Sequence, residues 1–189
     1  MGSSSSRLDS SSGGGVYTFR LFFYDVLDNE SAAKDYSMKD QILVKFQKLI
    51  DVSEVILCVM YYTNPLSGWQ VYKSAMSPDG LDSLQGKRNV HHAYVVFGTK
   101  NWWWSIEKNT ACVAIQRSKQ SELVSDMYHR TDRKSSLFTG IDREKTKSGQ
   151  RRTVQQLLEH IVAGGYVNEE YHFLTQNCQH FADRIYAYL

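Results

Sequence analysis

Cys178 stands in the C-terminal stretch YHFLTQNCQHFADRIYAYL, between Asn177 and Gln179. Phe181 and Ile185 are spaced as on one face of a helix, and Cys178 lies one turn before Phe181 on that face. Asparagine is a favoured N-cap residue, so Asn177 would begin this helix and place Cys178 in its first turn. The backbone N–H groups and the positive end of a helix favour a thiolate at such a position. The stretch therefore predicts an inward-facing cysteine at a place suited to a nucleophile.

A free thiol is only a few per cent ionised at pH 7, so a nucleophilic cysteine also needs a nearby imidazole. His180 lies only two residues on, about 200° around the helix, and points elsewhere. Three other histidines carry no distinguishing pattern: His129, His160 and His172. His91 and His92 remain, at the start of an expected strand. Neighbours on a strand face opposite sides, so only one of the two can face Cys178.

The elements that would position these residues alternate between strands and helices. Aromatic and β-branched residues predict a strand at 16–26 and a buried strand at 53–63, with a short strand at 69–73. Between the first two, apolar residues at helical spacing predict a helix at 37–50. Three strand-like runs between 90 and 118, separated by GTKN and EKNT, predict an antiparallel meander that starts at His91. Cys58 and Cys112 lie inside strand patterns, where a free cysteine packs as a small apolar residue.

The C-terminal part of the chain predicts two helices. Thr153 is a credible N-cap for the amphipathic stretch TVQQLLEHIV, which ends at AGG. Residues 117–152 between the meander and this helix are rich in Lys and Arg, and we interpret them as a basic, mobile insertion that would meet an acidic partner or cover a cleft. Residues 1–15 are rich in Ser and Gly and form a flexible leader or tail outside the fold. The prediction is one α+β domain at 16–189, with helices packed on the meander.

Composition removes several classes of function. The net charge of +2 is too small to indicate nucleic-acid binding, and no apolar run is long enough to cross a bilayer. Three widely spaced cysteines without a C-x-x-C pair form neither a disulfide framework nor a zinc site, which favours a reducing, cytoplasmic setting. No phosphate-binding Gly loop or metal motif is present, so neither a cofactor nor a metal is expected.

The cysteine stretch resembles the cysteine box of the circularly permuted papain-like (NlpC-type) hydrolases. It is most similar to the PPPDE, or desumoylating-isopeptidase-like, family, whose box runs Asn-Cys-Asn-x-Phe. It is also similar to the Asn-Cys-Glu-His-Phe box of the lecithin:retinol acyltransferase-like family. Both families carry an upstream histidine box, and HHAYVVFG matches it with His91 in the catalytic slot, Ala93 as the small residue and Gly98 closing the strand. The resemblance covers residues 90–116 and 166–189.

The resemblance implies a permuted papain-like fold and a thiol hydrolase that acts through Cys178, His91 and a thioester intermediate. Two departures from the family patterns stand out. Gln179 replaces the usual Asn or Glu, and a tryptophan stands where the acyltransferase-like group often has a second histidine. The catalytic group is therefore either a triad, with Ser105 or Glu107 as its third polar residue, or a Cys–His dyad, since the resemblance implies that isopeptidase-like members can act with a dyad. Gln176 is a candidate oxyanion donor.

Three functional hypotheses follow. The first is a hydrolase of peptide, isopeptide or thioester bonds, which the cysteine box favours because it matches the isopeptidase-like pattern at more positions. The second is a phospholipid-acyl hydrolase or acyltransferase, whose substrate would be a lipid acyl group. The third is a catalytically inert binding module on the same fold. Activity-probe labelling of Cys178 separates the third hypothesis from the first two.

Overall fold

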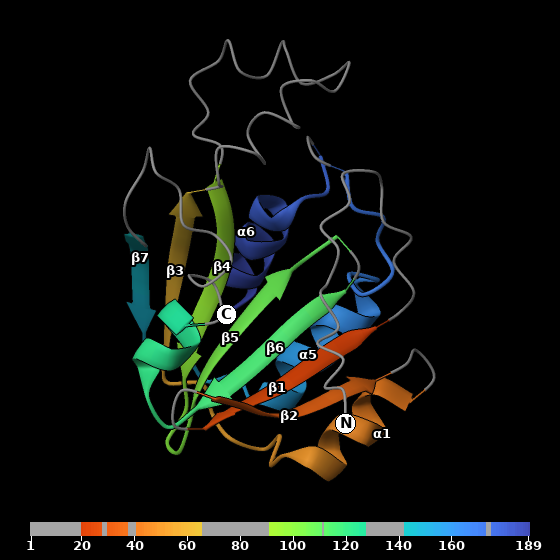
Figure 1. The fold of residues 1–189 in the computed structure, drawn as a ribbon, viewed down its shortest axis with the longest axis vertical. Coiled ribbons are helices and arrows are strands. Elements are labelled where there is room, and N and C mark those ends of the chain that lie inside the picture. Colours follow the sequence, from red (N-terminus) through yellow and green to blue (C-terminus); the bar gives the residue numbers. More distant parts are fainter. Residues whose placement is uncertain are drawn as a thin grey trace, which may run out of the picture.

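The computed structural model describes residues 20–27, 30–37, 41–65, 91–110, 112–127, 142–172 and 175–189. These residues form one seven-stranded sheet in the order β2-β1-β6-β5-β4-β3-β7 (Figure 1). The strands are β1 (Leu21–Leu27), β2 (Glu30–Ser37), β3 (Cys58–Pro65), β4 (His91–Gly98), β5 (Trp103–Lys108), β6 (Val113–Ser118) and β7 (Asp142–Ser148). β1 runs parallel to β6, and the other neighbouring pairs are antiparallel. The predicted α+β class is confirmed.

In the described part of the chain, three α-helices and one π-helical turn accompany the sheet: α1 (Ile42–Leu49), η2 (Leu123–Met127), α5 (Val154–Ala163) and α6 (Cys178–Tyr188). Thr153 caps α5, because its side chain accepts a hydrogen bond from the Gln156 N–H while the Gln156 side chain accepts from the Thr153 N–H. Gly165, at φ 70°, follows the end of this helix in the left-handed region. The sequence pattern therefore located the helix and its cap.

The predicted meander is confirmed as the antiparallel run β4, β5 and β6. The predicted helix at 37–50 is confirmed in part, since α1 begins at Ile42, and the strand at 53–63 begins only at Cys58. β2 was not predicted, because ESAAKDYS has no clear alternation of apolar and polar residues. The short strand predicted at 69–73 and residues 1–15 lie outside the described residues.

The basic segment 117–152 contains a strand that its composition does not reveal. β7 pairs with β3 at the edge of the sheet, and its sequence DREKTKS has no apolar residue to show a period of two. Charged side chains are common on edge strands, where water faces much of the strand. Backbone pairing and contacts such as Lys145 over the Tyr61 ring, 4.9 Å from its centroid, hold β7 in place.

Several cations of this segment contact the protein itself. Arg117 donates to both carboxylate oxygens of Asp25 and lies 4.2 Å from the centroid of the Trp102 ring. Lys147 donates to the Tyr186 carbonyl and Arg152 to the Tyr188 carbonyl. Cations at the carboxyl end of a helix satisfy exposed carbonyls and oppose the negative end of its dipole. Part of the basic charge therefore stabilises the end of α6.

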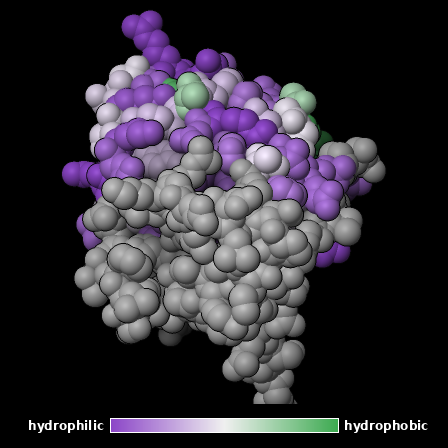
Figure 2. All heavy atoms as spheres, turned by 90° about the horizontal axis from the view of Figure 1, so that it is seen from above, coloured by the Kyte–Doolittle hydropathy of each residue, from purple (hydrophilic) through white to green (hydrophobic). Residues whose placement is uncertain are grey.

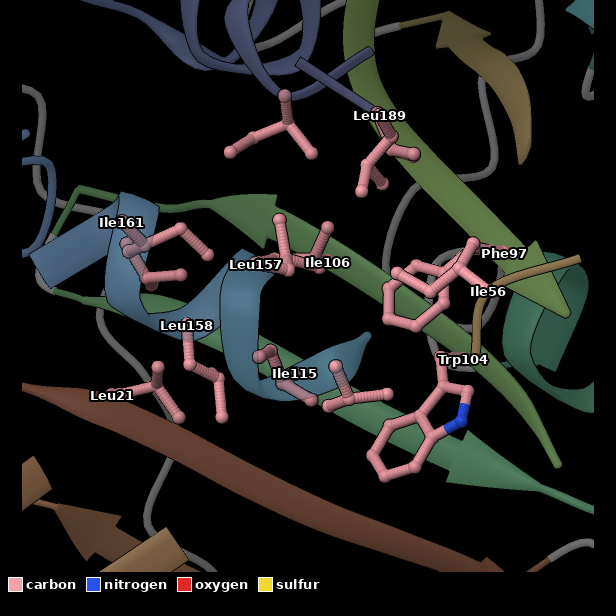
Figure 3. Close-up of a cluster of buried hydrophobic side chains, with 14 of the residues drawn as sticks. Leu21, Ile56, Phe97, Trp104, Ile106, Ile115, Leu157, Leu158, Ile161 and Leu189 are labelled. Atoms are coloured by element: carbon pink, nitrogen blue, oxygen red, sulfur yellow. The ribbon is translucent and has the colours of Figure 1, made fainter. Parts of the chain in front are cut away.

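The main core lies between one face of the sheet and the two C-terminal helices. Leu157, Leu158 and Ile161 of α5 face Ile106 and Ile115 of the meander, with Leu21, Ile56, Phe97, Trp104 and Leu189 around them (Figure 3). Each of these side chains is almost fully buried. At about 25 cal/mol per Å² of apolar surface removed from water, this layer is the main source of stability for the sheet–helix arrangement. This layer of buried side chains holds α6 against β4.

The opposite face of the sheet has its own smaller clusters. Val124 of η2 packs with Met60, Tyr94 and Val96, and the neighbouring Leu123 packs with a second group, Phe22, Tyr24 and Cys112. Burial raises the pKa of the Cys112 thiol to about 12, as expected for a cysteine that serves packing. Cys58 is half-buried at the rim of the first cluster. Both cysteines occupy the apolar surroundings that the sequence predicts.

Hydrophilic residues cover most of the described surface seen in Figure 2, and hydrophobic residues form small separate spots. Single exposed apolar side chains such as Val44 and Leu57 are ordinary on protein surfaces. Within the described part of the chain, no helix has the length and apolar character required to cross a bilayer.

Gly98 closes β4 because no side chain fits there. A Cβ at this position would lie 2.8 Å from a carbon of the Trp103 ring and 2.9 Å from Cys58 Sγ. We expect Gly98→Ala to lower the free energy of unfolding by about 1–3 kcal/mol, the usual cost of an overpacked site. Urea denaturation measures this loss. Adding Cys58→Ala removes the sulfur and should recover part of the stability; a neutral Gly98→Ala variant would contradict the packing argument.

Candidate active site

Cys178 is the first residue of α6. Asn177 is the N-cap, and its Oδ1 accepts hydrogen bonds from the Gln179 N–H at 2.9 Å and from the His180 N–H at 3.1 Å. The Cys178 side chain is 5% exposed and belongs to the buried stripe of α6 with Phe181, Ala182 and Ile185. The cysteine therefore faces the sheet at the positive end of the helix dipole.

His91 lies on the face of β4 that α6 covers. Ala93, Val95 and Phe97 of β4 belong to the core shared with α6, whereas Tyr94 and Val96 belong to the cluster on the other face. Side chains alternate along a strand, so His91 shares the face of Ala93. The amide Nε2 of Gln179 donates to the His91 carbonyl at 2.9 Å. This bond ties the start of β4 to the residue after Cys178.

His92 points to the other face of the sheet. Its Nε2 forms a buried hydrogen bond with the carboxylate of Glu107 of β5, and its ring stacks on Tyr94 with centroids 6.0 Å apart. His92 is 4% exposed and Glu107 is 1% exposed. A buried carboxylate must be paired or hydrogen-bonded, because burial of an isolated charge costs several kcal/mol. His92 therefore serves as the partner of Glu107 in the interior.

The candidates for a third polar residue lie away from α6. Trp104 and Ile106 of β5 point into the core under α6, so Ser105 and Glu107 between and after them point to the opposite face. Ser105 Oγ accepts from Gln116 Nε2 at 3.0 Å, and Glu107 is the partner of His92. The structure does not bring either residue together with Cys178. The sequence could not show on which face of the sheet Ser105 and Glu107 lie, because that depends on the phase of β5 in the folded sheet.

Gln176 lies directly before the N-cap of α6. Its backbone N–H donates to the His172 carbonyl at 3.0 Å. The half-buried Gln176 is therefore held next to the start of the helix. Its proposed part in binding an oxyanion remains a prediction.

The other described histidines have different neighbours. His180 is exposed, and its Nδ1 lies 2.9 Å from Asn177 Oδ1. His172 Nδ1 lies 2.9 Å from Thr175 Oγ1, and His160 stacks on Tyr188 at 3.7 Å between centroids. His129 lies outside the described residues. Among the described histidines, His91 is thus the one that strand phase and the Gln179 bond place on the side of Cys178.

Lys108, at the end of β5, is a charged residue of this region that the sequence did not reveal. It continues the alternation of Trp104 and Ile106 and so faces α6. Its side chain is fully buried, and Nζ donates to Glu169 Oε2 at 2.7 Å. Glu169 also accepts two hydrogen bonds from Arg184 of α6. Burial alone would raise the pKa of Glu169, but the bonds from Arg184 and Lys108 outweigh it and hold this pKa at about 2.

Tyr61 of β3 borders the opposite side of α6. Its hydroxyl donates to the carboxylate of Asp183, and its ring meets Tyr186 edge-on with centroids 5.9 Å apart. Burial, the Asp183 charge and a thiolate at Cys178 raise the pKa of Tyr61 above its ordinary value. Tyr61 is therefore a neutral group beside the cysteine at physiological pH.

The described sheet is mixed, Cys178 is buried at the start of α6, and His91 lies on the strand that α6 covers. The model of the PPPDE putative peptidase domain matches residues 19–189, and the chain belongs to this family. Membership indicates a function of the cysteine peptidase or isopeptidase type. Searches of curated proteins and of solved structures gave no significant match.

Proposed function

We propose that this protein is a thiol hydrolase in which Cys178 is the nucleophile and His91 the general base. The observation that carries the proposal is the bond from Gln179 to the His91 carbonyl. Through this bond the base-bearing strand and the first turn of α6 meet on one face of the sheet. The buried position of Cys178 at the helix start and the family of the domain both support the same pairing.

The chemistry would proceed in two stages. The His91 imidazole takes the proton of the Cys178 thiol, and the thiolate attacks the substrate carbonyl to form a tetrahedral intermediate. The imidazolium returns the proton to the leaving amine as the carbon–nitrogen bond breaks, which leaves a thioester on Cys178. Water, deprotonated by His91, then attacks the thioester and releases the carboxylic acid and the free thiol.

The developing oxyanion would be stabilised at the positive end of α6. The Cys178 N–H lies in the first turn, where backbone donors point out of the helix. Gln176, one residue before the N-cap, is the proposed second donor. A donor of this kind contributes about 3–4 kcal/mol to the stability of the transition state.

A protein substrate with an isopeptide or peptide bond is the class that we favour, because the cysteine box matches the isopeptidase-like pattern at the most positions. The test compares wild type and Cys178→Ala on a ubiquitin-like protein joined to a lysine side chain and, separately, on phosphatidylcholine vesicles. We expect wild type to cleave the conjugate and the variant to leave it intact.

Each other outcome has a definite meaning. Release of fatty acid without cleavage of the conjugate would move the substrate class to lipid acyl groups. Failure on both substrates, together with no labelling of Cys178 by an electrophilic activity probe, would favour an inert binding module.

A further inference from the structure

We propose that Lys108 is a positioning residue of this site, whose buried ammonium group stabilises the thiolate of Cys178. This inference rests on the proposed function, because it makes Lys108 a residue that helps to ionise the proposed nucleophile, Cys178. The chain of contacts begins at the end of β5 and reaches α6 through Glu169 and Arg184.

The topology brings Lys108 and Cys178 to the same end of the same face. β4 and β5 are antiparallel, so the end of β5 at Lys108 lies beside the start of β4 at His91. The first turn of α6 meets this start through the Gln179 bond. Lys108 faces α6, and Cys178 faces the sheet. The two side chains therefore point into the same layer from opposite sides.

The ion cluster around Lys108 has one net positive charge. Lys108 and Arg184 are both bonded to the single carboxylate of Glu169. Burial lowers the pKa of Lys108 below its ordinary value, and the bond that Lys108 donates to Glu169 opposes part of this effect. The Lys108 side chain is fully buried, so water screens its charge only weakly.

The coupling between Lys108 and Cys178 acts in both directions. A thiolate at Cys178 raises the pKa of Lys108. Because such coupling is reciprocal, the ammonium group of Lys108 favours the thiolate by the same free energy. Among the described side chains, Tyr61 on β3 and Lys108 on β5 are electrostatically coupled to Cys178, and Asp183 on α6 is bonded to Tyr61. His91 on β4 lies on the face of the sheet that α6 covers. Tyr61 is neutral and Asp183 is exposed, so neither cancels the positive cluster.

The test measures how fast iodoacetamide alkylates Cys178 in the full chain between pH 4 and 9. Peptide mass spectrometry separates Cys178 from Cys58 and Cys112. We expect Lys108→Met to raise the pH midpoint of alkylation by on the order of one unit, the lower end of the effect of a neighbouring charge. At pH values below the wild-type midpoint the rate should fall by up to about tenfold, because fewer molecules carry a thiolate.

Two further substitutions at Lys108 separate charge from packing. Lys108→Gln keeps a hydrogen bond to Glu169 but not the charge, and should match Lys108→Met. Lys108→Arg keeps the charge and should restore a midpoint close to that of wild type. Arg184 still pairs with Glu169 in all three variants, so the carboxylate keeps a partner. If Lys108→Met does not fold, Lys108→Gln decides the question.

Lys147→Met is the matched control. Lys147 is a half-buried lysine that likewise contacts α6, but it donates to the Tyr186 carbonyl at the other end of the helix. Its loss should leave the alkylation midpoint unchanged. An unchanged midpoint in Lys108→Met and Lys108→Gln, with a lowered midpoint in wild type, overturns the role of Lys108 alone. A wild-type midpoint near the ordinary thiol value of about 8.5 overturns both this role and the proposed function.

Discussion

Replacing Cys178 with alanine is expected to abolish turnover of the substrate, with a loss in kcat of at least about 10⁴-fold, because the nucleophile of the proposed thioester pathway is removed. The fold should persist, since Phe181, Ala182 and Ile185 still anchor α6 to the core. Initial rates on the isopeptide conjugate and circular dichroism of the variant measure these two effects.

Cys112→Ala is the control variant, because it also replaces a buried cysteine with alanine but does so away from the proposed site. Cys112 is also buried, but it packs with Phe22 and Tyr24 on the opposite face of the sheet. We expect this variant to keep its activity and to lose only the small amount of folding free energy that truncation of a core side chain costs.

In wild type, iodoacetamide at neutral pH should alkylate Cys178 faster than Cys58. Equal labelling of Cys58 and Cys178 from pH 5 to 9, or turnover by Cys178→Ala, would contradict the assignment.

His91→Ala and His92→Ala are expected to fail in different ways, although the two residues are neighbours. His91→Ala should lower kcat/KM by on the order of 10²–10⁴-fold, the usual contribution of a general base, with little effect on folding. His92→Ala removes the imidazole that is bonded to the buried carboxylate of Glu107 and should lower the free energy of unfolding by about 3–5 kcal/mol. Its folded fraction should retain activity.

The measurement combines urea denaturation with kcat/KM corrected for the folded fraction. The paired variants His91→Gln and His92→Gln serve as conservative controls, since glutamine can still donate a hydrogen bond to Glu107 but cannot act as a base near pH 7. We expect His92→Gln to be more stable than His92→Ala and His91→Gln to remain inactive. Activity that survives in His91→Ala but disappears from the folded fraction of His92→Ala would mean that the base is His92.

Several elements of the fold can be predicted from local sequence patterns alone. The spacing of Phe181 and Ile185 gave α6 and its inward face, and Asn177 was identified as a cap from its type and place. The meander from His91 to Ser118 followed from aromatic and β-branched runs between turns. Helical period, capping and alternation are local properties, so a single chain segment contains the information for each. These local patterns also reduced the candidates for the general base of Cys178 to two neighbouring histidines, His91 and His92.

The charged groups near the cysteine could not be predicted from local patterns, because they come together through tertiary contacts. Lys108, Glu169 and Arg184 are far apart in sequence and show no common motif, yet the sheet, the loop before α6 and α6 itself bring them into one ion cluster. The same holds for β7, whose charged sequence forms a strand because β3 offers an edge to pair with. Ser105 and Glu107 were plausible until the phase of β5 assigned them to the other face. Contacts between distant segments depend on register and packing, which no local pattern encodes.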